Sequence, residues 1–158
     1  MKIKHIVISG GGINLFTIYG CLKYLNKKKL WQIKNIKSLY GTSCGSLLSL
    51  LICLDITWDE LDLYLIKRPW DKLFTMSPIL LLESFNKKGV YNIDHFIKML
   101  NPLFEIKDYS IDMTLKELYD ITQITLNIFV TEINSLTLIK MNHITYPDIK
   151  VVKAVYMS

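Results

Sequence analysis

Features that define several other classes of protein are scarce in this 158-residue chain. Its three cysteines, Cys21, Cys44 and Cys53, are odd in number and lack the spacing of a metal site, so we expect free thiols in a reducing, cytoplasmic compartment. The apolar run at residues 47–54 contains a serine and is far shorter than the roughly 20 residues of a membrane-spanning helix. The stretch at 3–8 is too short for a secretory signal. The sequence therefore predicts a globular protein of the cytoplasm.

Acidic residues are missing from the first third of the chain. Residues 1–54 hold eight lysines and no Asp or Glu, a net charge of +8, whereas the remainder carries −3, which together give the net +5. A lysine-rich face could attract anionic lipid headgroups, and the alternative is an ordinary solvated surface. No basic run alternates with aromatic residues, so we expect no nucleic-acid binding. The lysines therefore allow a peripheral contact with membrane surfaces, and the alternative of a solvated surface stays open.

The first part of the chain has the pattern of a βαβα unit. The β-branched run at 3–8 ends in a glycine loop, and apolar residues recur at helical spacing over 14–26. A second strand at 36–40 and a helix at 44–54 follow. This order predicts an α/β fold with three α/β/α layers and a mainly parallel central sheet, in a single domain spanning 1–158.

Later elements are marked by capping boxes and turns. The boxes at Thr57–Glu60 and Thr114–Glu117 predict helix starts, and another helix is expected from Asn92 or Asp94 through Leu100, ended by Asn101-Pro102. Residues 75–91 are predicted to be an irregular surface excursion with one short helix. Strands at 125–132 and 136–141 predict a hairpin, and a final helix is expected from 146–148 to 158. We expect Val151, Val152 and Val155 of that helix to be exposed.

Two glycine-rich segments carry the candidate chemistry. The pentad Gly41-Thr42-Ser43-Cys44-Gly45 fits the G-x-S-x-G pattern of a nucleophilic serine on a tight strand-to-helix turn. Gly10, Gly11 and Gly12 follow the neighbouring strand, so both loops are expected at the carboxyl edge of the sheet. Their amides, together with the N–H of Cys44 at a helix N-terminus, could stabilise an oxyanion.

Other interpretations of these motifs remain open at this point. The glycine loop lacks the third glycine of a dinucleotide-binding G-x-G-x-x-G, because Leu15 occupies that position. Both motifs could also be purely structural turns. His5, His95 and His143 are candidate bases of a triad, although a lone histidine is usually structural. Cys44 is a less favoured nucleophile.

The segments Ser9-Gly10-Gly11-Gly12 and Gly41-Thr42-Ser43-Cys44-Gly45 together resemble the opening of the patatin-like phospholipases, and residues 114–158 resemble the family's later helix, hairpin and helix. The resemblance covers nearly the whole chain and is loosest over 55–110. It implies a lipid acyl hydrolase that acts on phospholipid or other acyl-ester lipid without metal or organic cofactor. It also implies that Ser43 is the nucleophile, that Gly41 and Gly45 form its elbow, and that the Gly10–Gly12 loop is the oxyanion hole.

The chain departs from the family pattern at two places. Ser9, Asn14 and Leu15 replace the acidic, basic and final glycine positions of the usual D-G-G-G-x-R/K-G motif. The family's catalytic aspartate lies in a D-G-G or D-G-A motif, and residues 1–158 contain neither. We therefore expect the domain to be incomplete at its C-terminal end, with the general base beyond residue 158, and the 158-residue chain alone to be inactive. The alternative is a truncated or degenerate relative that binds lipid or a protein partner without catalysis.

Overall fold

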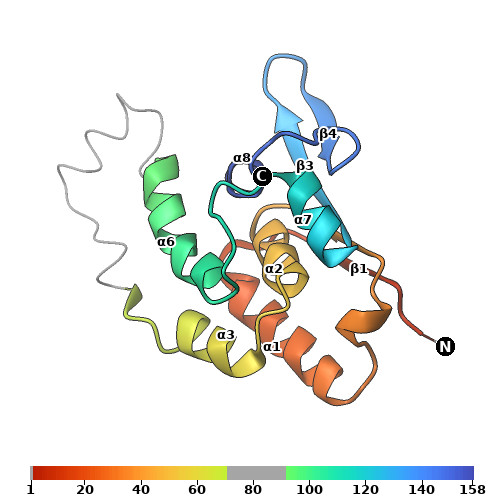
Figure 1. Ribbon diagram of the computed structural model, residues 1–158, viewed down its shortest axis with the longest axis vertical. Helices are drawn as coiled ribbons and strands as arrows, with labels where there is room; N and C mark the ends of the chain where they lie inside the picture. The colour runs from red at the N-terminus through yellow and green to blue at the C-terminus, as the bar shows by residue number, and fades with distance from the viewer. Residues whose placement is uncertain (1, 71–91) are drawn as a thin grey trace.

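The computed structural model describes residues 2–70 and 92–158, and it has a four-stranded sheet with helices packed on it (Figure 1). The strands are β1 (His5–Ile8), β2 (Ser38–Gly41), β3 (Thr125–Glu132) and β4 (Thr137–Met141). They lie in the order β1-β2-β3-β4, with parallel β1–β2 and β2–β3 pairs and an antiparallel β3–β4 pair. The predicted α/β class with a mainly parallel sheet is confirmed.

The helices of the first half connect and cover the parallel strands. A short 3-10 turn η1 (Gly12–Asn14) leads into α1 (Leu15–Lys27), and a second turn η2 (Ile33–Asn35) precedes β2. After β2 the chain forms α2 (Cys44–Cys53) and α3 (Trp58–Leu65). Helix α2 is the central element of the core, because all of its residues from Gly45 to Cys53 except Leu47 are buried.

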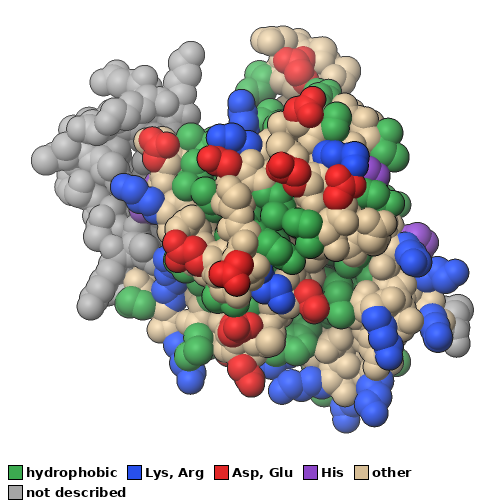
Figure 2. Space-filling model, viewed as in Figure 1, with side chains coloured by type: hydrophobic (Ala, Val, Ile, Leu, Met, Phe, Trp, Pro, Cys, Tyr) green, Lys and Arg blue, Asp and Glu red, His purple; other side chains and the backbone are tan. Residues whose placement is uncertain are grey.

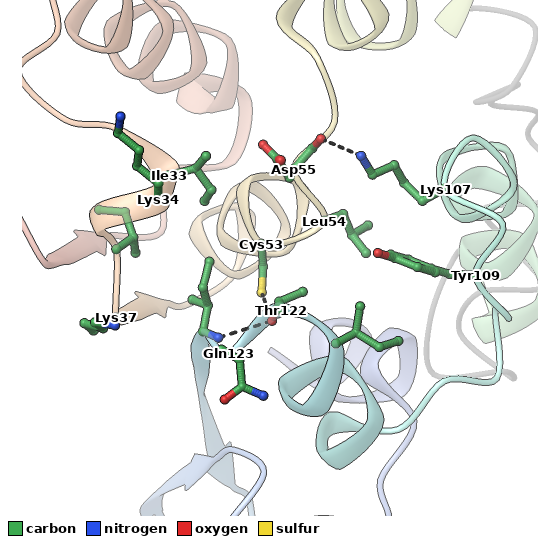
Figure 3. A pocket seen from close by; sticks show the side chains of 13 residues that line it. Ile33, Lys34, Lys37, Cys53, Leu54, Asp55, Lys107, Tyr109, Thr122 and Gln123 are labelled. Carbon is green, nitrogen blue, oxygen red and sulfur yellow. Dashed lines mark hydrogen bonds between the residues drawn. The ribbon is translucent and has the colours of Figure 1, made fainter.

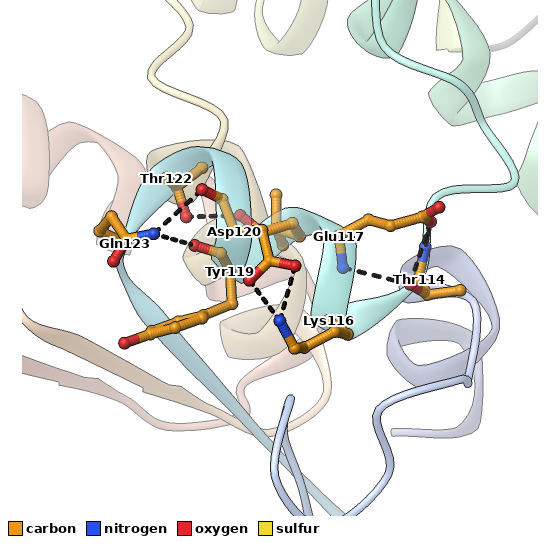
Figure 4. Close-up of polar contacts among 8 residues, drawn as sticks. Thr114, Lys116, Glu117, Tyr119, Asp120, Thr122 and Gln123 are labelled. Atoms are coloured by element: carbon orange, nitrogen blue, oxygen red, sulfur yellow. Dashed lines mark hydrogen bonds and ion pairs between the residues drawn. The ribbon is translucent and has the colours of Figure 1, made fainter.

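The later helices complete the packing around α2. They are α6 (Ile93–Glu105), α7 (Leu115–Thr122) and α8 (Val151–Met157). The predicted capping boxes are present at α3 and α7, and Figure 4 shows the second one, where Thr114 and Glu117 bond each other's backbone amides. On the same helix, Lys116 forms an ion pair with Asp120, four residues later. Because both side chains are exposed, such a pair stabilises the helix by only about 0.2–0.5 kcal/mol.

The two faces of the sheet differ in burial. Ile8 and Ile128 each pair with Gly41, and Leu39 lies two residues before Gly41 on the same face of the sheet. This is the face that α2 covers, and the three side chains are almost completely buried. The opposite face carries Val7, which is 77% exposed, and the stacked rings of Tyr40 and Phe129. The hydrophobic core of the described residues therefore lies on the α2 side of the sheet and surrounds that helix.

Two predicted helix bounds are wrong. Helix α6 does not end at Asn101-Pro102 but continues to Glu105, because Leu103 and Phe104 are fully buried in the core and hold the last turn in place. Helix α8 begins only at Val151. The residues before it form turns and bends, and backbone bonds hold them against the start of α7, including Leu115 N–H to Ile149 O at 2.9 Å.

The expected exposure of the last helix is also wrong. Val151, Val152 and Val155 are buried, since α8 packs against α6, α2 and β3. The predicted surface excursion at 75–91 lies outside the described residues. No helix in the described ranges is long and apolar enough to cross a membrane.

Candidate functional site

Ser43 occupies a sharp turn between β2 and α2. Its backbone has φ 53° and ψ −130°, in a region that residues other than glycine rarely adopt. Such a conformation costs about 1–3 kcal/mol and persists only where the surrounding structure enforces it. The Ser43 hydroxyl makes no hydrogen bond to the helix it precedes, and no partner for it occurs among residues 2–70 and 92–158. The turn therefore presents an exposed hydroxyl.

The two glycines that flank Ser43 are required by close backbone contacts. A Cβ on Gly45 would lie 2.7 Å from the carbonyl oxygen of Ser9 and closer still to that of Ile8. A Cβ on Gly41 would lie 2.5 Å from the carbonyl oxygen of Gly45. Both separations are too short for a carbon atom. The G-x-S-x-G spacing therefore lets α2 start directly against the ends of β1 and β2.

The glycine loop after β1 reaches the serine. A Cβ on Gly10 would lie 3.2 Å from Ser43 Cβ, so the two backbones are adjacent. Gly12 has φ 54°, a left-handed conformation that favours glycine. In the described part of the chain, the amides of Gly10, Gly11, Gly12 and Cys44 have no hydrogen-bond acceptor. The structure thus brings together the residues that the sequence singled out at the carboxyl edge of the sheet.

A pocket of about 240 Å³ opens beside Ser43. Besides Ser43 and Cys44 it is lined by Leu47 from α2, by Phe96 from α6, and by Val155, Tyr156 and Ser158 from the end of α8. The rings of Phe96 and Tyr156 contact each other, with centroids 5.8 Å apart. No motif in the sequence marks Phe96, Tyr156 or Ser158 as residues of the site. Only the three-dimensional packing of α6 and α8 against α2 places them there.

Ser158 contacts the serine turn directly. The Ser43 N–H donates to Ser158 Oγ at 2.8 Å, and Ser158 Oγ donates to the carbonyl oxygen of Phe129 at 2.7 Å. Thr42 Oγ1 donates to the same Phe129 carbonyl at 3.4 Å. A single carbonyl within β3 therefore accepts hydrogen bonds both from the turn and from the residue that contacts it.

A second, apolar hollow borders the site. Its volume is about 470 Å³, and it is lined by Gly12, Ile13, Leu15, Phe16, Leu47, Tyr64, Leu65, Trp70 and Met99. Leu47 lines both this hollow and the pocket of Ser43, and Gly12 belongs to the glycine loop. An apolar space that shares Leu47 with the Ser43 pocket has the chemistry to hold a hydrocarbon chain.

The three histidines that are candidate bases, His5, His95 and His143, do not line the pocket of Ser43. His5 Nδ1 bonds Ser38 Oγ at 2.7 Å, at the starts of β1 and β2. The amide of His95 is capped by Asn92 at the start of α6. His143 stacks on Tyr119 at 3.6 Å, and its partial burial lowers its pKa. In the described residues, a general base for Ser43 is therefore not found among the histidines.

Another pocket, of about 410 Å³, lies near the amino ends of β2 and β3 (Figure 3). The carboxyl ends of α2 and α7 form part of its wall, and Lys107 Nζ donates at 2.9 Å to the carbonyl of Asp55, which follows α2. Cys53 is buried there beside Thr122, and its burial raises the pKa of the thiol to about 12. The thiol is therefore protonated at neutral pH and is a poor nucleophile.

The sequence is similar to a known protein family and to two viral proteins. The profile of the family described as patatin-like phospholipase matches residues 6–158. The chain is 26% identical, over 98% of its length and 52% of the relative's, to a protein of Invertebrate iridescent virus 6 named a probable lipid hydrolase. It is 25% identical, over 99% of its length and 51% of the relative's, to an uncharacterized protein of Acanthamoeba polyphaga mimivirus. The chain thus spans about half the length of these curated relatives.

Proposed function

Because the chain belongs to the patatin-like phospholipase family, we propose that it supplies the nucleophile and the oxyanion hole of a lipid acyl hydrolase. The observation that carries this proposal is the contact between the Gly10 backbone and Ser43, which is held at φ 53° on the turn into α2. The name of the iridescent-virus relative, a probable lipid hydrolase, supports the same substrate class. No metal or organic cofactor is needed for the reaction proposed.

In the proposed reaction, Ser43 Oγ attacks the carbonyl carbon of an ester and its proton passes to a general base. The negative charge that develops on the carbonyl oxygen is stabilised by the free amides of Gly10, Gly11, Gly12 and Cys44, which need no reorganisation during the step. The protonated base then gives its proton to the leaving alcohol, and an acyl-serine remains. Water, activated by the same base, releases the fatty acid and restores the serine.

We place the general base outside residues 1–158. Among the described residues that line the Ser43 pocket, none carries a carboxylate or imidazole group. The family resemblance implies an aspartate in a D-G-G or D-G-A motif. Without a base the hydroxyl of Ser43 stays protonated near pH 7 and is a weak nucleophile. The 158-residue chain alone is therefore proposed to be inactive.

The acyl chain is proposed to lie in the apolar hollow between α1, α3 and α6. Gly12 and Leu47 are at its border, so an ester whose carbonyl contacts the oxyanion loop can extend its hydrocarbon chain past Leu47. Burying each methylene in such a site contributes about 0.8 kcal/mol to binding. The substrate is accordingly a phospholipid or another long-chain acyl ester.

Lysines support a further proposal, a peripheral contact with anionic surfaces. Figure 2 shows Lys and Arg side chains gathered at the lower right of the view, over the end of α1 and near the start of β1. The three lysines that end α1, Lys27 to Lys29, are followed by Lys34 and Lys37 before β2. We propose a cytoplasmic protein held near membranes by this charge, and the free thiols of Cys21, Cys44 and Cys53 suit that compartment.

Hydrolysis of a phospholipid by the intact protein that contains this chain tests the proposed function. Released fatty acid is measured for the wild type, for Ser43→Ala, and for Ser110→Ala as a control in an exposed serine outside the site. We expect Ser43→Ala to lose several orders of magnitude in rate and Ser110→Ala to retain it. A wild type that binds lipid vesicles without hydrolysing them would instead favour the inactive relative.

A further inference from the structure

The backbone of Ser43 needs support on both sides of its strained turn. On the carboxyl side, its carbonyl accepts from Ser46 N at 2.9 Å and from Ser46 Oγ at 2.6 Å, which ties it to the first turn of α2. On the amino side, the described residues offer its N–H a single acceptor, the hydroxyl of Ser158. The peptide group between Thr42 and Ser43 is therefore held at its carbonyl by the Gly45 N–H, which donates to Thr42 O at 2.9 Å, and at its N–H by the hydroxyl of Ser158.

The hydroxyl of Ser158 is itself oriented. Its proton is directed to the carbonyl oxygen of Phe129 at 2.7 Å, so a lone pair of Oγ faces the Ser43 N–H at 2.8 Å. Phe129 lies in β3, one residue beyond the Ile128 that pairs with Gly41 at the end of β2. The hydroxyl thus connects the serine turn to the middle of the adjacent strand, where Phe129 also pairs with Lys140 of β4.

The position of Ser158 is fixed by the packing of α8. Val151, Val152 and Val155 anchor that helix in the core, and the Ser158 N–H donates to the Val155 carbonyl at 3.2 Å. Ser158 also lines the Ser43 pocket, yet its hydroxyl is engaged by Phe129 and by the Ser43 amide. Its contacts therefore suit the support of the nucleophile better than proton transfer.

We propose that Ser158 is a positioning residue of the site, whose hydroxyl holds the Ser43 turn so that Ser43 Oγ stays aligned with the oxyanion loop. The proposal rests on the proposed function of Ser43. Gly10 lies so near Ser43 that a Cβ there would be 3.2 Å from Ser43 Cβ, so a small rotation of the turn changes the geometry between nucleophile and amides. Misplacement by about 1 Å can reduce a reaction rate about 100-fold.

Fluorophosphonate labelling of the intact protein separates positioning from binding. The saturating rate of labelling at Ser43 and the probe concentration for half-saturation are measured for the wild type, Ser158→Ala and Ser158→Thr. We expect Ser158→Ala to lower the saturating rate by about 10- to 100-fold while half-saturation changes little. Ser158→Thr keeps the hydroxyl and should label near the wild-type rate. All rates are compared at a temperature where circular dichroism shows each variant folded.

The outcomes distinguish this proposal from the proposed function. Labelling of Ser158→Ala at the wild-type rate, or an equal loss in Ser158→Ala and Ser158→Thr, would overturn the positioning role while leaving Ser43 as nucleophile. A wild type that is not labelled at Ser43 would overturn the proposed function and, with it, the catalytic purpose of Ser158. Hydrogen exchange at the Ser43 amide supplies a second readout, since it should be faster in Ser158→Ala than in Ser158→Thr.

Discussion

At the scale of single residues, the site depends on positions where a side chain is either forbidden or strained. Gly41 and Gly45 have no room for a Cβ, because the ends of β1 and β2 approach the start of α2 there. Ser43 keeps its Cβ at the cost of a left-handed backbone. The motif glycines are therefore required by packing as much as by chemistry.

Gly45→Ala tests this packing argument. The new methyl group would overlap the carbonyl oxygens of Ile8 and Ser9, so we expect the free energy of unfolding to fall by about 3 kcal/mol or more. Gly20→Ala is the matched control: a Cβ at Gly20, in the exposed middle of α1, meets no atom within 4 Å. It should raise the free energy of unfolding by roughly 0.5–1 kcal/mol. Urea unfolding measures both, and equal stability of the two variants would contradict the account.

At the scale of elements, local sequence patterns predicted most of the fold. Capping boxes at Thr57 and Thr114 marked the starts of α3 and α7 correctly, and the β3–β4 hairpin was expected within one residue. Errors arose where distant contacts override local signals. Leu103 and Phe104 extend α6 past Asn101-Pro102, and backbone pairing with the start of α7 delays α8.

The candidate site was predictable only in part, for the same reason. The loop Gly10–Gly12 and the turn at Ser43 follow adjacent strands, so sequence order alone indicated that they meet. Ser158 lies 115 positions from Ser43 and has no motif around it. Its contact, like those of Phe96 and Tyr156, depends on how α6 and α8 pack against α2.

A polar cluster between α1 and α3 gives a pH-dependent prediction. The Asp62 carboxylate accepts from Lys23 and from Tyr19 Oη, the latter at 2.6 Å, and these bonds lower its pKa. A lowered carboxyl pKa stabilises the folded state above the unfolded value of about 4, and this contribution is lost as the pH falls through the folded value. Asp62→Asn should therefore be less stable than the wild type at pH 6, with the difference shrinking towards pH 3.

Thermal unfolding between pH 3 and pH 6 measures this effect. Asp148→Asn, at an exposed carboxylate outside the cluster, serves as the control and should follow the wild type at every pH. A difference between wild type and Asp62→Asn that stays constant over this range would contradict the role of the Asp62 charge.

At the scale of the whole molecule, the lysines and the candidate site lie at opposite ends of the parallel strands. Ser43 and the Gly10–Gly12 loop follow the carboxyl ends of β1 and β2, whereas Lys4 and Lys37 precede their amino ends. Helix α1 runs from the glycine loop back to this amino edge, where it ends at Lys27. The proposed attraction of these lysines to an anionic surface would therefore concentrate the protein near lipid without placing the serine against the bilayer.

This arrangement predicts that surface binding and catalysis respond separately to charge changes. The double substitution Lys28→Glu and Lys34→Glu should weaken binding to anionic vesicles several-fold at low salt, and binding of the wild type should itself weaken as salt rises to physiological strength. Cleavage of a soluble, monomeric ester should be unchanged, because both lysines lie at the amino edge. Vesicle co-sedimentation and ester cleavage measure the two effects, and salt-independent binding, or equal binding to neutral vesicles, would count against the electrostatic contribution.

The central claim, that Ser43 is a nucleophile facing the glycine loop, is tested most directly by locating the covalent adduct of a fluorophosphonate on the intact protein. Peptide mapping by mass spectrometry after brief labelling identifies the modified residue. We predict a single adduct on Ser43, absent from the Ser43→Ala variant and present in Ser110→Ala. A protein that hydrolyses lipid while its adduct lies on another residue, or while Ser43→Ala is labelled as fast as the wild type, would contradict the claim.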